Sequence, residues 1–250
     1  MQLASLGSGS KGNATLLRCD NSCVLIDCGY SLKQLEKRLQ RIDLTIGDIS
    51  AILLTHEHSD HGAGIARLLS RREIPLWTSI GTARALKLEN FHAISGGQIF
   101  ELCEDLQVQA VTVPHDAAEP IQFVFTQSSS GRKLGILTDS GHITTHMIQA
   151  YDGVHALLLE FNYDEQMLQQ GPYPWHLKQR VGGLHGHLSN LQSMQMLQQI
   201  DTSELDCLIA GHISEKNNST RIVEQILQKI PLKHEPVLAT QQQGFGWLEI

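Results

Sequence analysis

Short apolar runs bounded by polar or glycine-rich turns recur along the whole chain, and most have the length of a β-strand. Apolar positions three or four apart, as at Leu32, Leu35 and Leu39, instead predict helices with one apolar face. The predicted strands cover residues 1–6, 14–18, 23–27, 51–55, 106–113, 121–126, 133–137, 157–161, 205–210 and 246–250. The predicted helices cover residues 32–41, 63–71, 191–199 and 220–229.

This order begins and ends in β structure and mixes strands with helices, which favours an α/β fold of two sheets with helices on their outer faces. No linker, repeat or low-complexity tract interrupts the chain, so we expect a single domain over residues 1–250. Residues 171–187 hold Pro172, Pro174 and several glycines, and this composition predicts an irregular loop beside an active site.

The composition is that of an ordinary globular protein, with 41% hydrophobic and 18% charged residues. No signal peptide is recognisable at the N-terminus, and no apolar run approaches the roughly 20 residues of a membrane span. The cysteine count is odd, and no C-x-x-C pair occurs, which favours reduced thiols that pack as small core residues. We therefore expect a cytoplasmic protein without a membrane partner. The cysteines are Cys19, Cys23, Cys28, Cys103 and Cys207.

The net charge of −7 argues against a general nucleic-acid coat, because such a protein needs an excess of Lys and Arg. Bound divalent cations would add positive charge at the site, however, and the net charge of the whole chain does not reveal a local basic patch. The 13 histidines are the unusual component of this chain.

Six residues, His56-Glu57-His58-Ser59-Asp60-His61, directly follow the apolar run at residues 51–55. Side chains two apart on extended backbone point the same way, so His56 and His58 can contact one ion. Asp60 and His61 fall at the start of the next helix and can face a second ion. The hexapeptide therefore predicts one half of a two-metal site.

Three later strands each end in another residue of a metal-ligand type. His115 follows the run that ends at Val113, Asp139 follows the run that ends at Leu137, and His212 follows the run that ends at Ala210. The order H-x-H-x-D-H, then His, Asp and His, resembles the metallo-β-lactamase-fold hydrolase superfamily. That resemblance spans almost the whole chain and implies a four-layer αββα sandwich.

The resemblance also implies a ligand set. By analogy, one metal is bound by His56, His58 and His115, the other by Asp60, His61 and His212, and Asp139 bridges the two. Donors that are all N or O suit Zn²⁺, Mn²⁺ or Fe, and do not separate them. The two ions would lie roughly 3.5–4 Å apart and share a hydroxide. The remaining isolated histidines are better read as surface or core residues: His92, His146, His155 and His234.

The glycine-rich stretch Gly7-Ser8-Gly9-Ser10-Lys11-Gly12 matches the dinucleotide fingerprint G-x-G-x-x-G by letter, but that fingerprint must open a helix. The following residues predict a strand, so the fingerprint reading fails. Two alternatives remain open: a flexible hairpin loop, or a backbone nest that holds a substrate phosphate with Ser8, Ser10, Lys11 and Asn13.

Three stretches narrow the substrate class: residues 8–13, Glu160-Phe161-Asn162-Tyr163-Asp164, and Gly186-His187-Leu188-Ser189-Asn190. Together they resemble the YycJ/WalJ-like branch, near the ribonuclease Z and ribonuclease J nucleases, which implies 5′-to-3′ exonuclease activity on DNA. An Asp at the bridging position, as at Asp139, is also similar to the pattern of the glyoxalase II, phosphodiesterase and nuclease branches, and differs from that of the true lactamases. The chain departs from the pattern at Phe161, where a small residue is expected.

The helix after His187 gives a physical reason for the last stretch. Ser189 or Asn190 can cap that helix, whose N-terminus would attract a phosphate, and His187 can protonate a leaving oxygen. Lys178 and Arg180 either hold a backbone phosphate or belong to a solvated helix face.

We therefore expect a dinuclear metallohydrolase that acts on DNA 5′ ends. In this hypothesis the bridging hydroxide attacks phosphorus, Asp60 orients it, and His187 acts as the general acid. The rivals are a cyclic-nucleotide phosphodiesterase, a glyoxalase II-like thioesterase and, in another class, a non-catalytic DNA-repair adaptor with a structural metal.

Overall fold

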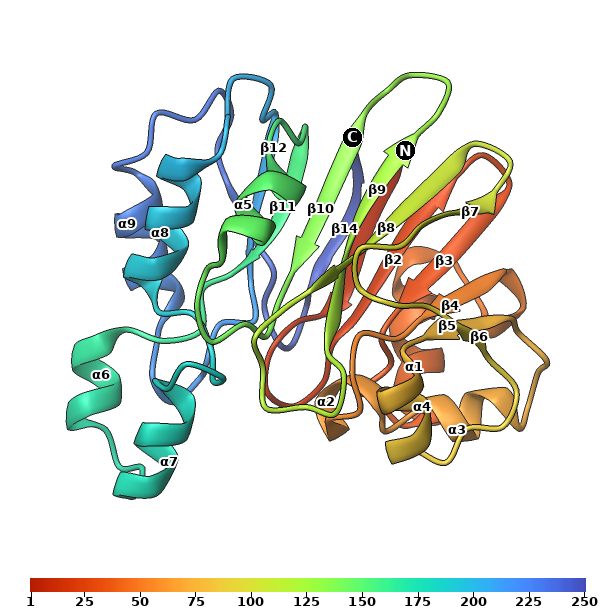
Figure 1. The fold of residues 1–250 in the computed structure, drawn as a ribbon, viewed down its shortest axis with the longest axis horizontal. Coiled ribbons are helices and arrows are strands. Elements are labelled where there is room, and N and C mark those ends of the chain that lie inside the picture. The colour runs from red at the N-terminus through yellow and green to blue at the C-terminus, as the bar shows by residue number, and fades with distance from the viewer.

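Two seven-stranded mixed sheets form the centre of the structure, which is a computed structural model that describes residues 1–250 (Figure 1). The first sheet has the order β14 (Phe245–Glu249), β1 (Gln2–Gly7), β2 (Ala14–Cys19), β3 (Ser22–Ile26), β4 (Ala51–Leu53), β5 (Leu76–Thr78) and β6 (His92–Ala93). The second has the order β13 (Val237–Leu238), β12 (Cys207–Gly211), β11 (Ala156–Glu160), β10 (Lys133–Leu137), β9 (Ile121–Gln127), β8 (Leu106–Thr112) and β7 (Ile99–Cys103).

Each sheet joins an antiparallel half to a parallel half. In the first sheet β14, β1, β2 and β3 pair antiparallel, and β3 to β6 pair parallel. In the second sheet β7 to β10 pair antiparallel, and β10 to β13 pair parallel. The parallel halves matter most for function, because ligands of open α/β sheets usually lie at the carboxyl ends of such strands.

Apolar side chains from both sheets meet in one central cluster, which holds Leu17 and Ile26 of the first sheet beside Phe123 and Ile136 of the second. A second cluster lies between the second sheet and the helices on its outer face, and a third lies outside the first sheet. The predicted αββα sandwich is therefore confirmed. The helices are α1 (Leu32–Leu39), α2 (Ser59–Gly62), α3 (Ile65–Leu69), α4 (Ile80–Ala85), α5 (Thr145–Tyr151), α6 (Glu165–Gln170), α7 (Trp175–Val181), α8 (Asn190–Gln199) and α9 (Thr220–Leu227).

The predicted strands occur within two residues of their expected positions, but several elements differ from the sequence prediction. The helix expected over 63–71 is the shorter α3, over Ile65–Leu69, and a separate short helix, α2, precedes it over Ser59–Gly62. A Cβ at Gly64, which lies between the two helices, would meet the Tyr30 carbonyl oxygen at 2.2 Å. The helix expected over 32–41 ends as α1 at Leu39 and continues as a 3₁₀ turn over Gln40–Ile42.

The prediction of an irregular loop over 171–187 was wrong in its centre, because α7 occupies Trp175–Val181. None of the side chains of α7 is buried, so the helix lacks the buried apolar face whose periodicity usually predicts a helix from sequence. The cysteines are free thiols, as expected, and burial raises the pKa of Cys28 to about 12. No helix combines the length and the apolar composition that crossing a bilayer requires.

Candidate metal centre

The hexapeptide lies where β4 ends. The three residues of β4 are all buried, as expected of a strand covered on both faces, and they place His56 with no exposed surface. His58 is the N-terminal cap residue of α2, and its carbonyl oxygen accepts from the backbone N–H of His61 at 2.9 Å. This turn brings Asp60 and His61 back over the end of the sheet, so local structure assembles half of the cluster.

Three strand ends of the second sheet complete the cluster. His115 follows β8, Asp139 follows β10 and His212 follows β12, and all three side chains are buried. Asp139 and His212 adopt left-handed backbone conformations, with φ of 54° and 51°. Such conformations are uncommon outside glycine and concentrate at functional sites, where the surrounding structure holds them.

Two of the clusters of ligand-type atoms match the two predicted ligand sets, and a further cluster joins Asp139 and His212 to Glu160 and His187. His56, His58 and His115 make the first group, in which His115 Nε2 lies 3.2 Å from His58 Nδ1. Asp60, His61 and His212 make the second, in which Asp60 Oδ2 lies 3.6 Å from His61 Nε2 and 3.5 Å from His212 Nε2. Within each group the candidate atoms all lie within 4.8 Å of one another.

Asp139 lies between the two groups. Its Oδ2 is 2.9 Å from His61 Nε2, and its Oδ1 is 3.9 Å from His115 Nε2. Burial disfavours the charged carboxylate, but the neighbouring His212 and His61 rings outweigh it and hold the pKa of Asp139 well below its usual range. One carboxylate thus reaches both groups.

Two ring nitrogens of these residues are buried and form no hydrogen bond: His56 Nε2 and His212 Nε2. A buried polar atom without a partner costs about 1–3 kcal/mol. The opposite nitrogens of the two rings are engaged, since His56 Nδ1 lies 2.9 Å from Thr55 Oγ1 and His212 Nδ1 lies 2.9 Å from Glu160 Oε1. Unpartnered ring nitrogens that point into a cluster of carboxylates and other imidazoles fit divalent cations, which would satisfy them.

Asp27 is a site residue that the sequence analysis missed. Its Oδ2 lies 2.7 Å from His61 Nδ1, and its Oδ1 accepts from the Thr55 backbone N–H at 2.8 Å. A carboxylate on the far nitrogen of a metal-binding histidine fixes the ring orientation and the tautomer. The available signal was that Asp27 directly follows the apolar run of β3, as the ligands follow theirs.

Glu160 is the second missed residue. It is fully buried at the end of β11, and its Oε1 lies 2.8 Å from His187 Nδ1 and 2.9 Å from His212 Nδ1. Its Oε2 accepts from the backbone N–H of Leu188 at 3.1 Å. Burial opposes the charge on Glu160, but His187 and His212 lower its pKa to about 2.

His187 is held against the cluster through one ring nitrogen. Its Nδ1 lies 2.8 Å from Glu160 Oε1 and 3.2 Å from Asp139 Oδ1. Burial disfavours the protonated ring, but these two carboxylates raise the pKa of His187 to about 9. A protonated imidazole with one nitrogen so engaged has its second N–H available to donate a proton.

The glycine-rich loop at residues 7–13 is bonded to the cluster. Ser8 Oγ accepts from the His212 backbone N–H at 2.8 Å, and Asn13 Nδ2 lies 2.9 Å from His61 Nε2. Both side chains are buried, which makes them supports of the ligands and leaves no open nest around them. Ser10 and Lys11 are exposed, and Lys11 forms an ion pair with Glu215.

The other candidate substrate contacts divide in the same way. Ser189 caps α8 by accepting from the Gln192 backbone N–H at 3.2 Å, and the buried Asn190 bonds to Asn218. These two side chains are therefore committed to the protein interior. Arg180 is exposed on α7 and bonds to Asp116 beside the cluster. None of the ligand-type clusters includes the histidines that the sequence set aside: His92, His146, His155 and His234.

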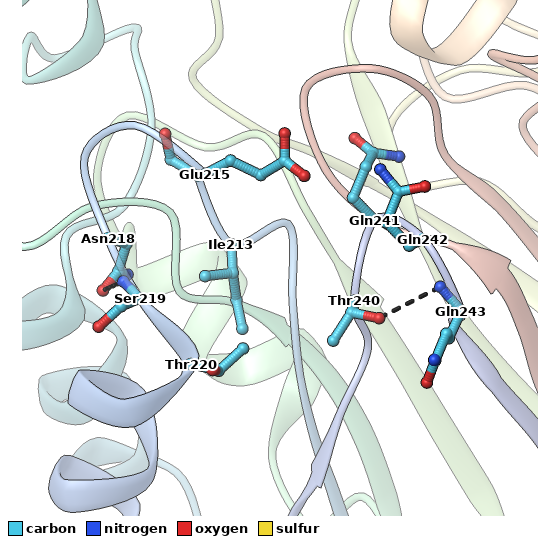
Figure 2. A pocket seen from close by; sticks show the side chains of 10 residues that line it. Ile213, Glu215, Asn218, Ser219, Thr220, Thr240, Gln241, Gln242 and Gln243 are labelled. Carbon is cyan, nitrogen blue, oxygen red and sulfur yellow. Dashed lines mark hydrogen bonds between the residues drawn. The ribbon is translucent and has the colours of Figure 1, made fainter.

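A cavity of about 570 Å³ lies beside the cluster, between the N-terminus of α9 and the turn after β13 (Figure 2). Its single apolar lining residue, Ile213, follows His212 in the chain, and the remaining lining is polar, with Glu215, Thr220 and Gln242 among it. The cavity contains none of the cluster ligands, so it adjoins the centre without forming it.

Comparison with known proteins identifies the family. The model of the β-lactamase superfamily domain matches residues 23–213. The exodeoxyribonuclease YycJ of Bacillus anthracis is 30% identical over 98% of this chain and 91% of its own length. The exodeoxyribonuclease WalJ of Streptococcus pneumoniae is 31% identical over 85% of this chain and 81% of its own. The chain belongs to the β-lactamase superfamily of metallohydrolases, in the group that contains these two proteins.

Solved structures agree on the fold. The Zn²⁺-bound PqqB of Methylobacterium extorquens superposes with a TM-score of 0.77 at 16% identity, and each chain is covered completely. The short form of human tRNase Z superposes with a TM-score of 0.68 at 20% identity, with 100% of this chain and 99% of that chain covered. At these identities the likeness establishes the architecture alone.

Proposed function

We propose that this protein is a dinuclear metal-dependent phosphodiesterase that removes nucleotides from the 5′ end of DNA. The observation that carries the proposal is the Glu160–His187 pair beside the two groups of metal-ligand atoms, because it combines a metal centre with a positioned proton donor. The similarity to proteins named exodeoxyribonucleases over nearly the whole chain supports DNA as the substrate.

In this proposal His56, His58 and His115 would hold one divalent ion, Asp60, His61 and His212 would hold the other, and Asp139, whose carboxylate reaches both groups, would serve both. When bound, the two ions supply Lewis acidity: they lower the pKa of a water and neutralise charge on the phosphate. The donor set suits Zn²⁺ or Mn²⁺, and Fe also fits it.

The protein groups supply the remaining chemistry. Asp60 is partly exposed, so its carboxylate can both hold an ion and orient the attacking water. His187 donates the proton from Nε2 to the leaving oxygen while Glu160 fixes its other nitrogen. Asp27 holds His61 and Ser8 holds the backbone of His212, so the ligands are positioned before an ion arrives. Ser10, Lys11 and Arg180 remain the exposed candidates for phosphate contacts.

The test is an assay of the purified protein on 5′-phosphorylated and unphosphorylated duplex DNA, single-stranded DNA and RNA, with Mn²⁺ or Zn²⁺. A cyclic nucleotide, bis(p-nitrophenyl) phosphate and a glutathione thioester serve as small substrates. We expect mononucleotides released from 5′ ends of DNA. Hydrolysis of the thioester or cyclic nucleotide alone would favour the small-molecule rivals, and no hydrolysis of any substrate would favour the adaptor.

Asp60→Ala and Asp139→Ala should each reduce DNA cleavage to background while the circular dichroism spectrum is retained. Asp206→Ala is the matched control, because this carboxylate lies just before β12, at the opposite end of the strand from His212, in a half-buried pair with Arg132. Full activity in Asp60→Ala or Asp139→Ala would contradict the proposed centre.

A further inference from the structure

Helices α6 and α7 lie apart from the sandwich, at the lower left of Figure 1. We call residues 165–187, which comprise both helices and the segment returning to the cluster, the arm. Lys178 Nζ donates to the Gln169 carbonyl oxygen at 2.6 Å and so ties α7 to α6. No side chain of α7 is buried, which leaves the helix without the apolar anchoring that surface helices normally have.

The arm presents large apolar side chains to solvent. Trp175 is 72% exposed and Leu184 is 69% exposed, the two highest values among the large hydrophobic residues exposed in this chain. Trp175 opens α7 directly after Pro174, and Pro172 lies two residues earlier, so the backbone that carries the indole has little freedom to lose on binding.

The charge around Trp175 differs from that of the rest of the chain. The sequence holds 26 acidic residues and a net charge of −7, yet none of them falls between Gln166 and Ile200. Lys178 and Arg180 lie on α7 itself. The nearest acidic groups along the chain are Asp164 and Glu165, at the start of α6, where Asp164 caps the helix. Asp116, which lies next to this segment in space, is paired with Arg180, so a polyanion would meet little repulsion along it.

The arm is continuous with the metal centre. The Gly186 carbonyl oxygen lies 2.8 Å from His115 Nδ1, and the His185 carbonyl oxygen accepts from the Asp116 backbone N–H at 2.9 Å. Arg180 bonds to the Asp116 side chain. A strand that leaves the cluster on this side therefore passes directly onto the arm.

We propose that the arm binds the single-stranded part of a DNA substrate, with Trp175 stacking on a base and Lys178 close to the phosphates. Exposed aromatic side chains beside cationic ones are the usual elements of such surfaces, because every base offers a face for stacking. This inference rests on the proposed function and assigns it a substrate surface outside the metal centre.

The experiment measures binding of the full-length protein in EDTA, where the centre cannot cleave. Fluorescence anisotropy compares an oligo-dT strand with an abasic strand of the same length. Trp175→Ala should weaken oligo-dT binding about 5- to 150-fold, the range expected for one base stacked on an aromatic ring, and Trp175→Phe should restore most of it. On the abasic strand the wild type and Trp175→Ala should bind equally.

Ile99→Ala is the control, because Ile99 is also exposed but lies on the edge strand β7 and not in the arm. Hydrolysis of bis(p-nitrophenyl) phosphate reports on the centre and the fold independently, and Trp175→Ala should leave it unchanged.

Equal oligo-dT binding by the wild type and Trp175→Ala would overturn the inference and, if the wild type cleaves DNA, would leave the proposed function intact. A wild type that hydrolyses the ester but neither binds nor cleaves DNA would overturn both. A concentration-dependent dimer that Trp175→Ala abolishes without changing DNA binding would assign the surface to a second copy of the chain and also overturn the inference.

Discussion

Two segments flank the candidate metal centre, the loop at residues 7–13 and the arm at residues 165–187, and both contain several glycines. The loop is bonded into the protein at many points, since Asn13 alone contacts Gly9, Asp60 and His61. The arm is attached at its base, and α7 buries none of its side chains. Glycine content therefore does not distinguish the firmly held loop from the exposed arm. The two segments differ in how many of their polar groups have hydrogen-bond partners in the rest of the protein.

The difference suggests a division of labour. The loop positions ligands, because Ser8 bonds to the backbone of His212 and Asn13 lies against His61. The arm is available for contacts with a large substrate, because none of the side chains of its helix α7 is buried. Substitutions in the loop should then act through the centre and the fold, and substitutions in the arm should act through substrate binding.

The largest of these effects is expected at the base of the arm, where His187, its last residue, bonds to Glu160 at the end of β11. Glu160→Gln removes the negative charge that orients His187 and raises its pKa, so that less of the ring is protonated. The kcat should therefore fall about 10²- to 10⁴-fold, the usual contribution of a general acid. KM for DNA should change little. His187→Ala should produce a similar loss, and steady-state kinetics on a 5′-labelled duplex would measure both.

Metal content by mass spectrometry separates the two contacts of Glu160, because the same carboxylate also bonds to His212. Equal metal content in Glu160→Gln, His187→Ala and the wild type would place the effect at the proton donor. Loss of metal from Glu160→Gln alone would contradict that assignment and point to the His212 contact.

A smaller effect is expected for Asp27, which lies on the loop side of the centre. Asp27→Asn should weaken metal binding about 10- to 100-fold, because the neutral amide orients His61 less strongly than the carboxylate does. Asn is the suitable replacement since Asp27 has φ of 62°, a conformation that Asn tolerates. Calorimetric titration of the metal-free protein would measure the change, and unaltered affinity would contradict the role of Asp27.

The smallest effect concerns the stability of the loop. Gln241 Oε1 accepts from the Lys11 backbone N–H at 2.7 Å, and its Nε2 donates to the Gly12 carbonyl oxygen at 2.8 Å. Gln241→Ala removes both bonds, although the Gly12 carbonyl oxygen still accepts from the Tyr30 hydroxyl. At about 0.5–1.5 kcal/mol for each bond, the free energy of unfolding should fall by about 1–3 kcal/mol, measured by urea denaturation.

Lys11→Ala is the control for Gln241→Ala. It breaks the ion pair with Glu215, whose two side chains are 69% and 44% exposed, so the free energy of unfolding should change by no more than about 0.5 kcal/mol. A larger loss in Lys11→Ala than in Gln241→Ala would show that the loop is held by its surface contact and not by its buried hydrogen bonds.

The sequence by itself determined the sandwich and the order of the ligand-type residues. His56 to His61 are close in the chain, and His115, Asp139 and His212 each follow a strand, so strand ends at one edge of the sandwich bring them together. Most strands were recognisable because apolar runs bounded by turns carry a local signal. The strands β5, β6 and β13 were not predicted, because two or three residues are too few for any periodicity. The edge strand β7 was also missed, since all five of its residues are exposed or half-buried and it has no buried face.

Only the tertiary structure decided what surrounds the ligands. Asp27 lies in no motif, and Glu160 opens a recognised stretch that gave it no role; their partners His61 and His187 are distant in sequence. The sequence offered Ser8 and Asn13 as candidate phosphate contacts. In the structure both are buried, and they bond to His212 and His61 instead. The helix in the arm was hidden because it packs no apolar face against the body. Sequence patterns report what a segment buries locally, whereas hydrogen-bond partners between distant segments exist only once the chain has folded.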